Sequence, residues 1–341
     1  MTRVLVTGAS GFIGRHLVAR LCGAGYQVAG LDRRPAPPGR QSGTHAQVDL
    51  LDAAELSRAV ADAAPEAVLH LAARTDLDGR DVSDYAANVE GVANLVEAIR
   101  AAGTVRRAVC TSTQLVCRIG YQPASDTDYQ PSTPYGASKV RTEQIWRAAD
   151  GGGTTWCLTR PTTIWGPHMN PHYLRFFRMI REGRYVHVSG GPHWKSYGYV
   201  GNTAFQYQRL LEAPAGQVHQ RAFWAADYDP LNLEAWAERF RAELGAPPIR
   251  TIPRVVAAAG ARLGDALVRL GWRSFPFTTF RLTNVVTSYI VDLTATQEVC
   301  GELPFDQDEG VAATAAWLRE IWETPPAAGA LLAMTSGGSR T

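Results

Sequence analysis

The best candidates for acid–base chemistry in this sequence are Tyr135 and Lys139, which lie four residues apart in PYGASK. On a helix, that spacing puts both side chains on one face. A phenol with a pKa of about 10 is a poor base at neutral pH, but a nearby ammonium favours the phenolate and lowers that pKa. The chain has only two lysines, Lys139 and Lys195, so each is expected to serve where an arginine cannot. We therefore expect Tyr135 to exchange a proton with an alcohol, and the alternative is a chance surface pair.

A second candidate site is the glycine-rich stretch TGASGFIG, in which Gly8, Gly11 and Gly14 directly follow a strand-like run. A dinucleotide pyrophosphate needs such a turn, because glycines allow the tight bend, the close approach of the phosphates and the packing of the next helix on the sheet. The N-terminus of that helix then offers free N–H groups to the anion. Asp32 ends the second strand, where a carboxylate would hold the adenosine ribose, although the Arg-Arg pair that follows could instead hold a 2′-phosphate. The alternative is a tight turn without a ligand.

Strand-like and helix-like stretches alternate over the first 165 residues, and these elements must position the candidate side chains. We expect strands at 3–8, 26–32, 45–50, 66–73, 107–113 and 155–160, and helices at 12–24, 51–63, 84–102 and 136–149. The run EAVLHLAA is apolar almost throughout, as in a parallel strand buried on both faces. The alternation predicts an α/β fold, a Rossmann-like doubly wound parallel sheet.

The rhythm breaks after Pro167, where aromatic residues, proline and glycine become denser. We expect a dinucleotide-binding domain over 1–166, with a return at about 196–214. A smaller, mostly C-terminal α/β substrate domain should comprise 167–195 and 215–323. Residues 324–341 are rich in small side chains and are expected to form a flexible tail.

The composition of the 341 residues favours a soluble enzyme. Apolar residues make up 45% and charged residues 19% of the chain, which suits a packed core and argues against disorder. The net charge of +2 suggests neither a nucleic acid nor a membrane as partner, and no apolar run is long enough for a membrane span. Five scattered cysteines and a start without a secretory signal pattern predict a cytoplasmic protein with reduced thiols.

Several motifs in order carry a family resemblance: TGASGFIG, Asp32, LHLAA, Asn88, TST at 111–113, the Tyr135–Lys139 pair and RPTTIWGP at 160–167. The chain resembles the extended short-chain dehydrogenase/reductase family, and within it the NAD-dependent epimerase/dehydratase group that acts on nucleotide sugars. The resemblance is continuous over 1–167 and resumes at 195–200. It implies NAD as cofactor, no metal, and a sugar-nucleotide substrate.

The resemblance also implies roles for individual residues. The catalytic set would be Thr113, Tyr135 and Lys139, with Ser112 as an alternative hydroxyl to Thr113. The cofactor would contact Gly8, Ser10, Gly11, Phe12, Ile13, Gly14, Asp32, Arg33, Asp49, Leu50, Leu71, Ala72, Ala73, Asn88, Thr111, Ser112, Tyr135, Lys139, Pro161 and Thr162. The substrate would contact Arg74, Thr113, Gln114, Tyr135, Thr163, Lys195 and Tyr199.

Departures from the family pattern concern the substrate side. Gln114 and Leu115 stand where 4,6-dehydratases have an acid and a base, and neither side chain can shuttle a proton, so dehydration is not expected. Thr163 stands where many members have an asparagine. Lys195 stands where they often have a phosphate-binding arginine, and it is expected to hold a diphosphate as a point charge.

These observations favour a sugar-nucleotide epimerase that works at C4 through a transient 4-keto intermediate, with Tyr135 as base. The alternatives are a reductase or dehydrogenase of a keto sugar or another secondary alcohol, including the 3β-hydroxysteroid type, and a cofactor-binding regulator without turnover. The intact Tyr, Lys and Thr set argues against the regulator. The segments 84–102 and 136–149 resemble helices that pair in family dimers, so we expect a homodimer.

Overall fold

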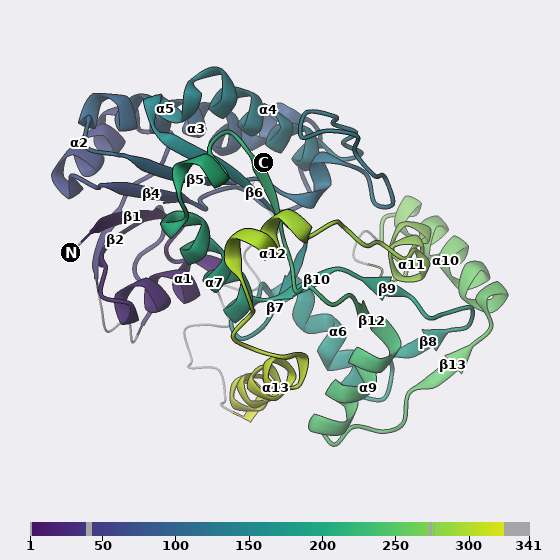
Figure 1. Cartoon of the computed structure of the whole chain (residues 1–341). Helices are drawn as coiled ribbons and strands as arrows, with labels where there is room; N and C mark the ends of the chain where they lie inside the picture. Colours follow the sequence, from purple (N-terminus) through teal and green to yellow (C-terminus); the bar gives the residue numbers. More distant parts are fainter. Residues whose placement is uncertain (1, 39–42, 273–274, 276, 324–341) are drawn as a thin grey trace.

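The computed structural model describes residues 2–38, 43–272, 275 and 277–323, and its centre is a seven-stranded sheet (Figure 1). The strand order is β11-β6-β5-β4-β1-β2-β3, and all neighbours are parallel. The strands are β1 (Arg3–Thr7), β2 (Gln27–Asp32), β3 (Thr44–Gln47), β4 (Ala67–His70), β5 (Arg107–Thr111), β6 (Thr155–Pro161) and β11 (Ala222–Ala225). The doubly wound Rossmann-like fold predicted from the alternation is therefore confirmed.

Helices cover both faces of this sheet, which explains its near-continuous apolar strands. On one face lie α1 (Phe12–Gly23), α7 (Val200–Glu212) and α12 (Thr294–Cys300), and on the other lie α2 (Ala53–Ala63), α3 (Ala86–Ala102), α4 (Pro134–Ala148) and α5 (Asp150–Gly153). Val4 and Val6 of β1 pack in the first core, whereas Leu5 packs in the second. Alternate side chains of a strand point to opposite faces, so both must be apolar.

A second layer of short strands and helices lies beyond the carboxyl ends of the sheet strands (Figure 1). Its strands are β7 (Thr163–Trp165), β8 (Val186–Val188), β9 (Trp194–Lys195), β10 (Tyr197–Tyr199), β12 (Leu231–Asn232) and β13 (Arg250–Ile252). Its helices are α6 (Pro171–Arg181), α9 (Leu233–Glu243), α10 (Arg254–Arg269), α11 (Thr279–Val286) and α13 (Gln307–Glu323), and the short helices η1 (Val82–Tyr85), η2 (Gln114–Val116) and α8 (Ala215–Val218) complete the chain. An aromatic core around Trp165, Phe177, Trp236 and Phe240 holds this layer together.

The boundary between the layers differs from the sequence expectation at β11, α12 and β10. Residues 222–225 were expected in the substrate domain, but as β11 they pair with β6 at the edge of the main sheet. α12 then packs against α7, so part of 294–300 also belongs to the sheet layer. Of the return expected at 196–214, α7 packs on the main sheet, whereas β10 pairs with β7 in the second layer. The return continues into β11, because that edge of β6 needs a hydrogen-bonding partner. The tail expected at 324–341 lies outside the described residues.

Candidate active site

The glycine turn joins β1 to α1 and is packed too tightly for a side chain at its glycine positions. Gly8 has a φ of +72°, and a Cβ there would lie 2.7 Å from the backbone nitrogen of Ala72. A Cβ on Gly14 would lie 2.1 Å from the carbonyl oxygen of Gly8. The first turn of α1 therefore sits directly on the loop, with its free N–H groups facing the carboxyl ends of the strands.

A cavity of about 590 Å³ opens between this turn and the second layer. β1 lies between β2 and β4, so the chain crosses the sheet in opposite directions on its two sides; open α/β sheets bind ligands at such a switch point. Of the expected cofactor residues the cavity is lined by Gly8, Gly11, Phe12, Ile13, Gly14, Asp32, Arg33, Asp49, Leu50, Leu71, Ala72, Ala73, Thr111, Ser112, Tyr135, Lys139, Pro161 and Thr162. Of the expected substrate residues it is lined by Arg74, Thr113, Gln114, Tyr135 and Thr163.

Asp32 lies at the end of β2 with its side chain almost completely buried. One carboxylate oxygen accepts the Ser10 N–H at 3.0 Å, and the other accepts the backbone N–H and the Nε–H of Arg34 at 3.0 and 3.3 Å. The carboxylate is thereby fixed at the edge of the cavity, where it favours a ribose with free hydroxyls and repels a 2′-phosphate. Ser10 itself does not line the cavity, because its hydroxyl donates to the carbonyl of Pro35.

Tyr135 and Thr113 line the floor of the cavity together. Tyr135 is the second residue of α4, and a Cβ on Gly136 would lie only 2.1 Å from the carbonyl of Leu115, so α4 starts directly on the loop after β5. This close contact holds the phenol beside the Thr113 hydroxyl. Burial raises the pKa of Tyr135, and the Thr113 hydroxyl, rather than Lys139 as expected, is the group that lowers it.

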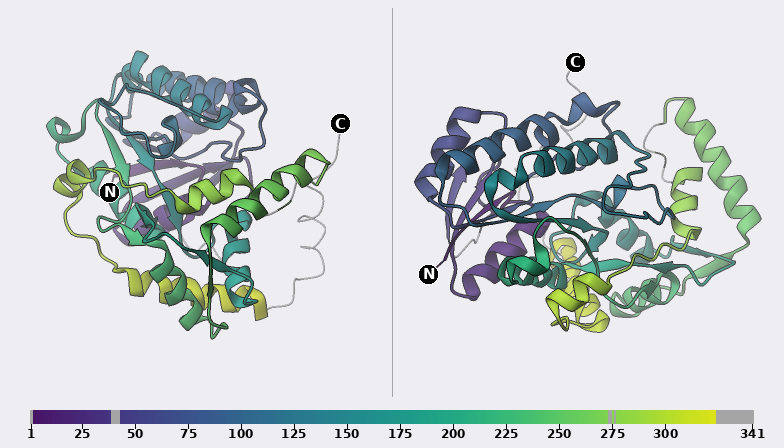
Figure 2. Two further views of the ribbon diagram at one scale, coloured as in Figure 1. Left: turned by 90° about the vertical axis from the view of Figure 1, so that its right-hand side faces the viewer. Right: turned by 45° about the horizontal axis from the view of Figure 1, so that its top comes forward.

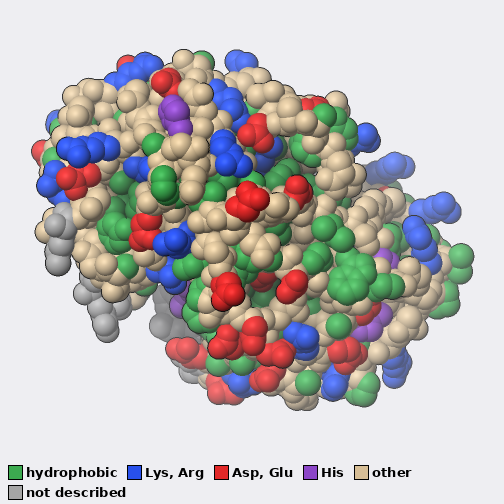
Figure 3. Space-filling view, in the orientation of Figure 1, with side chains coloured by type: hydrophobic (Ala, Val, Ile, Leu, Met, Phe, Trp, Pro, Cys, Tyr) green, Lys and Arg blue, Asp and Glu red, His purple; other side chains and the backbone are tan. Residues whose placement is uncertain are grey.

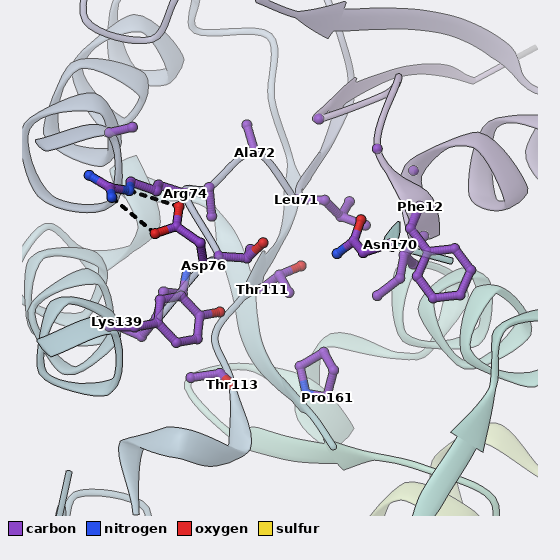
Figure 4. Close-up of a pocket in the computed structure, with 18 of the residues that line it drawn as sticks. Phe12, Leu71, Ala72, Arg74, Asp76, Thr111, Thr113, Lys139, Pro161 and Asn170 are labelled. Atoms are coloured by element: carbon purple, nitrogen blue, oxygen red, sulfur yellow. Dashed lines mark hydrogen bonds and ion pairs between the residues drawn. The ribbon is translucent and has the colours of Figure 1, made fainter. Parts of the chain in front are cut away.

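Lys139 lies one turn further along α4 and is 1% exposed. Its ammonium has no acceptor among the described residues, although it lines the cavity, and burial lowers its pKa. The hydroxyl of Ser112 is likewise buried without a hydrogen-bond partner. Buried polar groups are nearly always paired, so these two indicate a polar ligand such as the ribose of a dinucleotide. Figure 4 shows Lys139 and Thr113 on one side of the cavity and Phe12 on the other.

Asn88 is fully buried and does not line the cavity, contrary to its expected cofactor contact. Its amide accepts the Arg74 N–H at 2.8 Å and donates to the Arg74 carbonyl and the Ser138 hydroxyl, both at 2.9 Å. It thus ties the loop after β4 to α4, and it positions the site without touching a ligand there.

Lys195 and Tyr199 do not line the cavity either. The Lys195 ammonium donates to the backbone carbonyls of Asn284 and Thr287 at the C-terminal end of α11, and its side chain is buried. Tyr199 packs between Trp165 and Phe305. The expected diphosphate contact of Lys195 is therefore absent from this cavity, because α11 already supplies two acceptors for the ammonium.

Other lining residues were not anticipated as site residues. They include Asp76 from the loop after β4, Asn170 at the N-cap of α6 and Tyr173 within α6, whereas Arg34 beside Asp32 was anticipated as a possible 2′-phosphate contact. Asp76 pairs with Arg74 through two contacts of 2.8 and 2.9 Å (Figure 4). The signal for Asp76 was a charge three positions after LHLAA, in the loop after a strand, whereas nothing in the sequence placed α6 beside the sheet.

The fold and site define a dinucleotide-binding α/β protein whose cavity contains side chains for proton transfer. The sequence model of the NAD dependent epimerase/dehydratase family matches residues 4–226, more than half of the chain, so the chain belongs to that family. NAD is the cofactor of the family, and the glycine turn, Asp32, Ser112 and Lys139 fit it.

The proteins that are similar to this chain catalyse different reactions. It is 30% identical over 257 residues to the 2-alkyl-3-oxoalkanoate reductase of Stenotrophomonas maltophilia, covering 72% of this chain and 77% of the relative. It is 32% identical over 238 residues to the UDP-glucose 4-epimerase of Mycolicibacterium smegmatis, covering 63% and 74%. The solved UDP-glucose 4-epimerase of Thermotoga maritima has a TM-score of 0.72 at 22% identity, covering 94% of this chain and 99% of that one, which shows the shared fold.

Proposed function

We propose that this chain is an NAD-dependent oxidoreductase that interconverts a secondary alcohol and a ketone on a substrate without a diphosphate. Bound NAD supplies the hydride exchange at the alcohol carbon. Tyr135 exchanges the hydroxyl proton, and its partner Thr113 orients the same oxygen by a hydrogen bond. Lys139 holds the nicotinamide ribose and supplies positive charge one turn from the phenol. Asp32 makes NAD the preferred cofactor over NADP.

The proposed substrate class rests on how the positively charged side chains of the cavity are paired. Among the described lining residues the cations are Arg33, Arg34, Arg74 and Lys139. The first two lie beside Asp32 at the adenosine end, and Lys139 lies beside the phenol. Arg74 is held by both oxygens of Asp76 and by the Asp84 carbonyl at 2.7 Å. Apart from Lys139, which we assign to the nicotinamide ribose, a substrate diphosphate would find no unpaired cation at this end of the described cavity, and a buried anion without one is costly.

From the sequence, the C4 epimerase of a sugar nucleotide was the first expectation, with Lys195 as its phosphate ligand. The proposed function reverses that order. With Lys195 engaged by α11, the reductase or dehydrogenase of a keto sugar or another secondary alcohol is favoured. The reductase relative supports this order, since it covers more of the chain than the epimerase relative.

Sugar-nucleotide 4-epimerisation is the second candidate, and Asn170 favours it. Asn170 stands at the N-terminus of the 11-residue helix α6, lines the cavity, and makes no capping hydrogen bond with its side chain (Figure 4). An amide at a helix N-terminus is a suitable contact for a phosphate. Epimerisation and alcohol oxidation both begin with proton removal by Tyr135, so the substrate decides between them.

Measuring whether the reaction consumes NAD or NADH tests the proposal. The purified protein is incubated with NAD and a panel of secondary alcohols, with NADH and the matching ketones, and with UDP- and dTDP-hexoses, while absorbance at the NADH band and product stereochemistry are followed. We expect stoichiometric cofactor consumption with an uncharged alcohol or ketone. Conversion of a nucleotide sugar to its C4 epimer without added cofactor and without net NADH would overturn it. Tyr135→Phe controls for contaminating enzymes.

A further inference from the structure

Helix α10 buries its small side chains and exposes its large apolar ones, the reverse of an ordinary amphipathic helix. Ala257, Ala261 and Gly264 face α11 and the chain that precedes it, and a Cβ on Gly264 would lie 1.8 Å from the carbonyl of Phe277. On the outer side, Val255 is 76%, Leu263 61% and Leu270 84% exposed. Water disfavours such a face, and exposed apolar patches mark interaction sites.

The exposed apolar side chains are regularly arranged. Val256, Leu263 and Leu270 are spaced by seven residues, so they form one line along the helix. The arginines at 262 and 269 each precede one of these leucines and form a parallel line about 100° around the helix. Trp272 just beyond the helix is also exposed, at 56%. We call the surface of Val255, Val256, Leu263, Leu270 and Trp272 the arm face.

The segment around the arm face is strongly basic. Residues 250–281 contain six arginines and one acidic residue, Asp265, although the net charge of the whole chain is only +2. Asp265 is itself hydrogen-bonded to Thr279. α10 lies at the right-hand margin of the molecule in Figure 1 and in the right view of Figure 2, and Figure 3 shows basic and hydrophobic side chains along that edge.

We propose that the arm face docks on an anionic lipid bilayer surface, with the apolar line of α10 in the interface and Arg262 and Arg269 at the level of the phosphates. This combination of apolar side chains, an interfacial tryptophan and flanking arginines matches helices that lie in the plane of a membrane. A second copy of this chain fits less well, because a two-fold contact through the arm face would place arginines against arginines. The helix does not span the bilayer: none in the described part of the chain is long and apolar enough to do so.

Membrane partners were not expected from the overall charge, because the basic excess is local to this segment. The proposal is independent of the reaction, since no residue of the arm face lines the cavity. Its test uses the full chain as purified.

Vesicle co-sedimentation tests the proposal. The full chain is mixed with vesicles of pure phosphatidylcholine, or of phosphatidylcholine and phosphatidylglycerol at a ratio of about two to one. We expect binding to the anionic vesicles that weakens with added salt. Leu263→Glu with Leu270→Glu should reduce it by about tenfold or more, and Arg262→Gln with Arg269→Gln by about tenfold.

A matched control removes the same charge elsewhere: Arg58→Gln with Arg106→Gln, both exposed on the sheet layer, should leave binding unchanged. All variants are checked by circular dichroism, and the arginine pair decides the outcome should the leucine pair misfold. Absence of binding to anionic vesicles, or equal loss in the control, would overturn the proposal. So would a lipid-free oligomer that dissociates in Leu263→Glu with Leu270→Glu, since the arm face would then join two copies.

Discussion

At the scale of single residues, Tyr135 carries the proposed chemistry, so Tyr135→Phe should abolish most turnover. The substitution removes only the hydroxyl, and loss of a general acid or base typically costs about 100- to 10,000-fold. NAD affinity should stay within about twofold, because the ring and Lys139 remain. Steady-state kinetics and NAD titration measure both effects. Tyr26→Phe, which loses a hydroxyl bonded to Glu212 far from the cavity, is the matched control. Activity above half of the wild-type value would remove Tyr135 from the mechanism.

The direction of the Tyr135 pKa shift predicts the pH dependence. Burial raises this pKa, so the phenolate that accepts a proton from an alcohol is scarce at neutral pH. Alcohol oxidation should therefore speed up as pH rises through the alkaline range. Ketone reduction uses the protonated phenol and should persist there. Initial rates in both directions against pH test this, and an oxidation rate that falls from pH 7 to pH 9 would contradict it.

Substitution of Lys195 distinguishes a structural role of this residue from a role in substrate binding. Lys195→Met leaves the carbonyls of Asn284 and Thr287 without their donor, and an unsatisfied buried acceptor costs about 1–3 kcal/mol. We expect a lower melting temperature together with an unchanged KM. Thermal unfolding and substrate titration check the two parts. Substrate binding weakened by tenfold or more at unchanged stability would return Lys195 to the diphosphate role.

At the scale of elements, the contact between the glycine turn and α1 should tolerate no added atom. Gly14→Ala forces a Cβ against the Gly8 carbonyl, and overpacking of this kind costs about 1–3 kcal/mol. NAD binding should weaken as well, because the loop that would hold the pyrophosphate must move. Gly23→Ala ends the same helix with open space around it and should be neutral or slightly stabilising. Denaturant unfolding and NAD titration of both variants decide the matter.

The sheet elements were predictable because their signals are local. Apolar strands, the glycine turn and the spacing of Tyr135 and Lys139 each depend on neighbours within a few residues. The direction in which the Lys195 side chain points was not predictable from its sequence motif. It lies on β9, and whether a strand side chain faces a ligand or a helix depends on what packs there, which for Lys195 is α11, almost ninety residues later in the chain.

At the scale of the whole molecule, the arm face shows a related limit of sequence patterns. The periodicity of α10 indicates an amphipathic helix, and the ordinary expectation would bury its valines and leucines. The structure instead buries alanines and a glycine, since only small side chains allow α11 and Phe277 to approach so closely. Which stripe is covered depends on distant segments. The local sequence does not carry that information.

A homodimer is expected as well, formed through helices α3 and α4. α3 and α4 lie side by side on one face of the sheet, and they expose Glu90 and Glu97 on one helix and Arg141 on the other. A two-fold axis that pairs α3 of one subunit with α4 of its partner would place these opposite charges together. Light scattering on a sizing column should give twice the monomer mass. Arg141→Glu should weaken the dimer by about tenfold or more, while Arg58→Glu on α2 should not. A monomeric wild-type chain, or a dimer unaffected by Arg141→Glu, would exclude this interface.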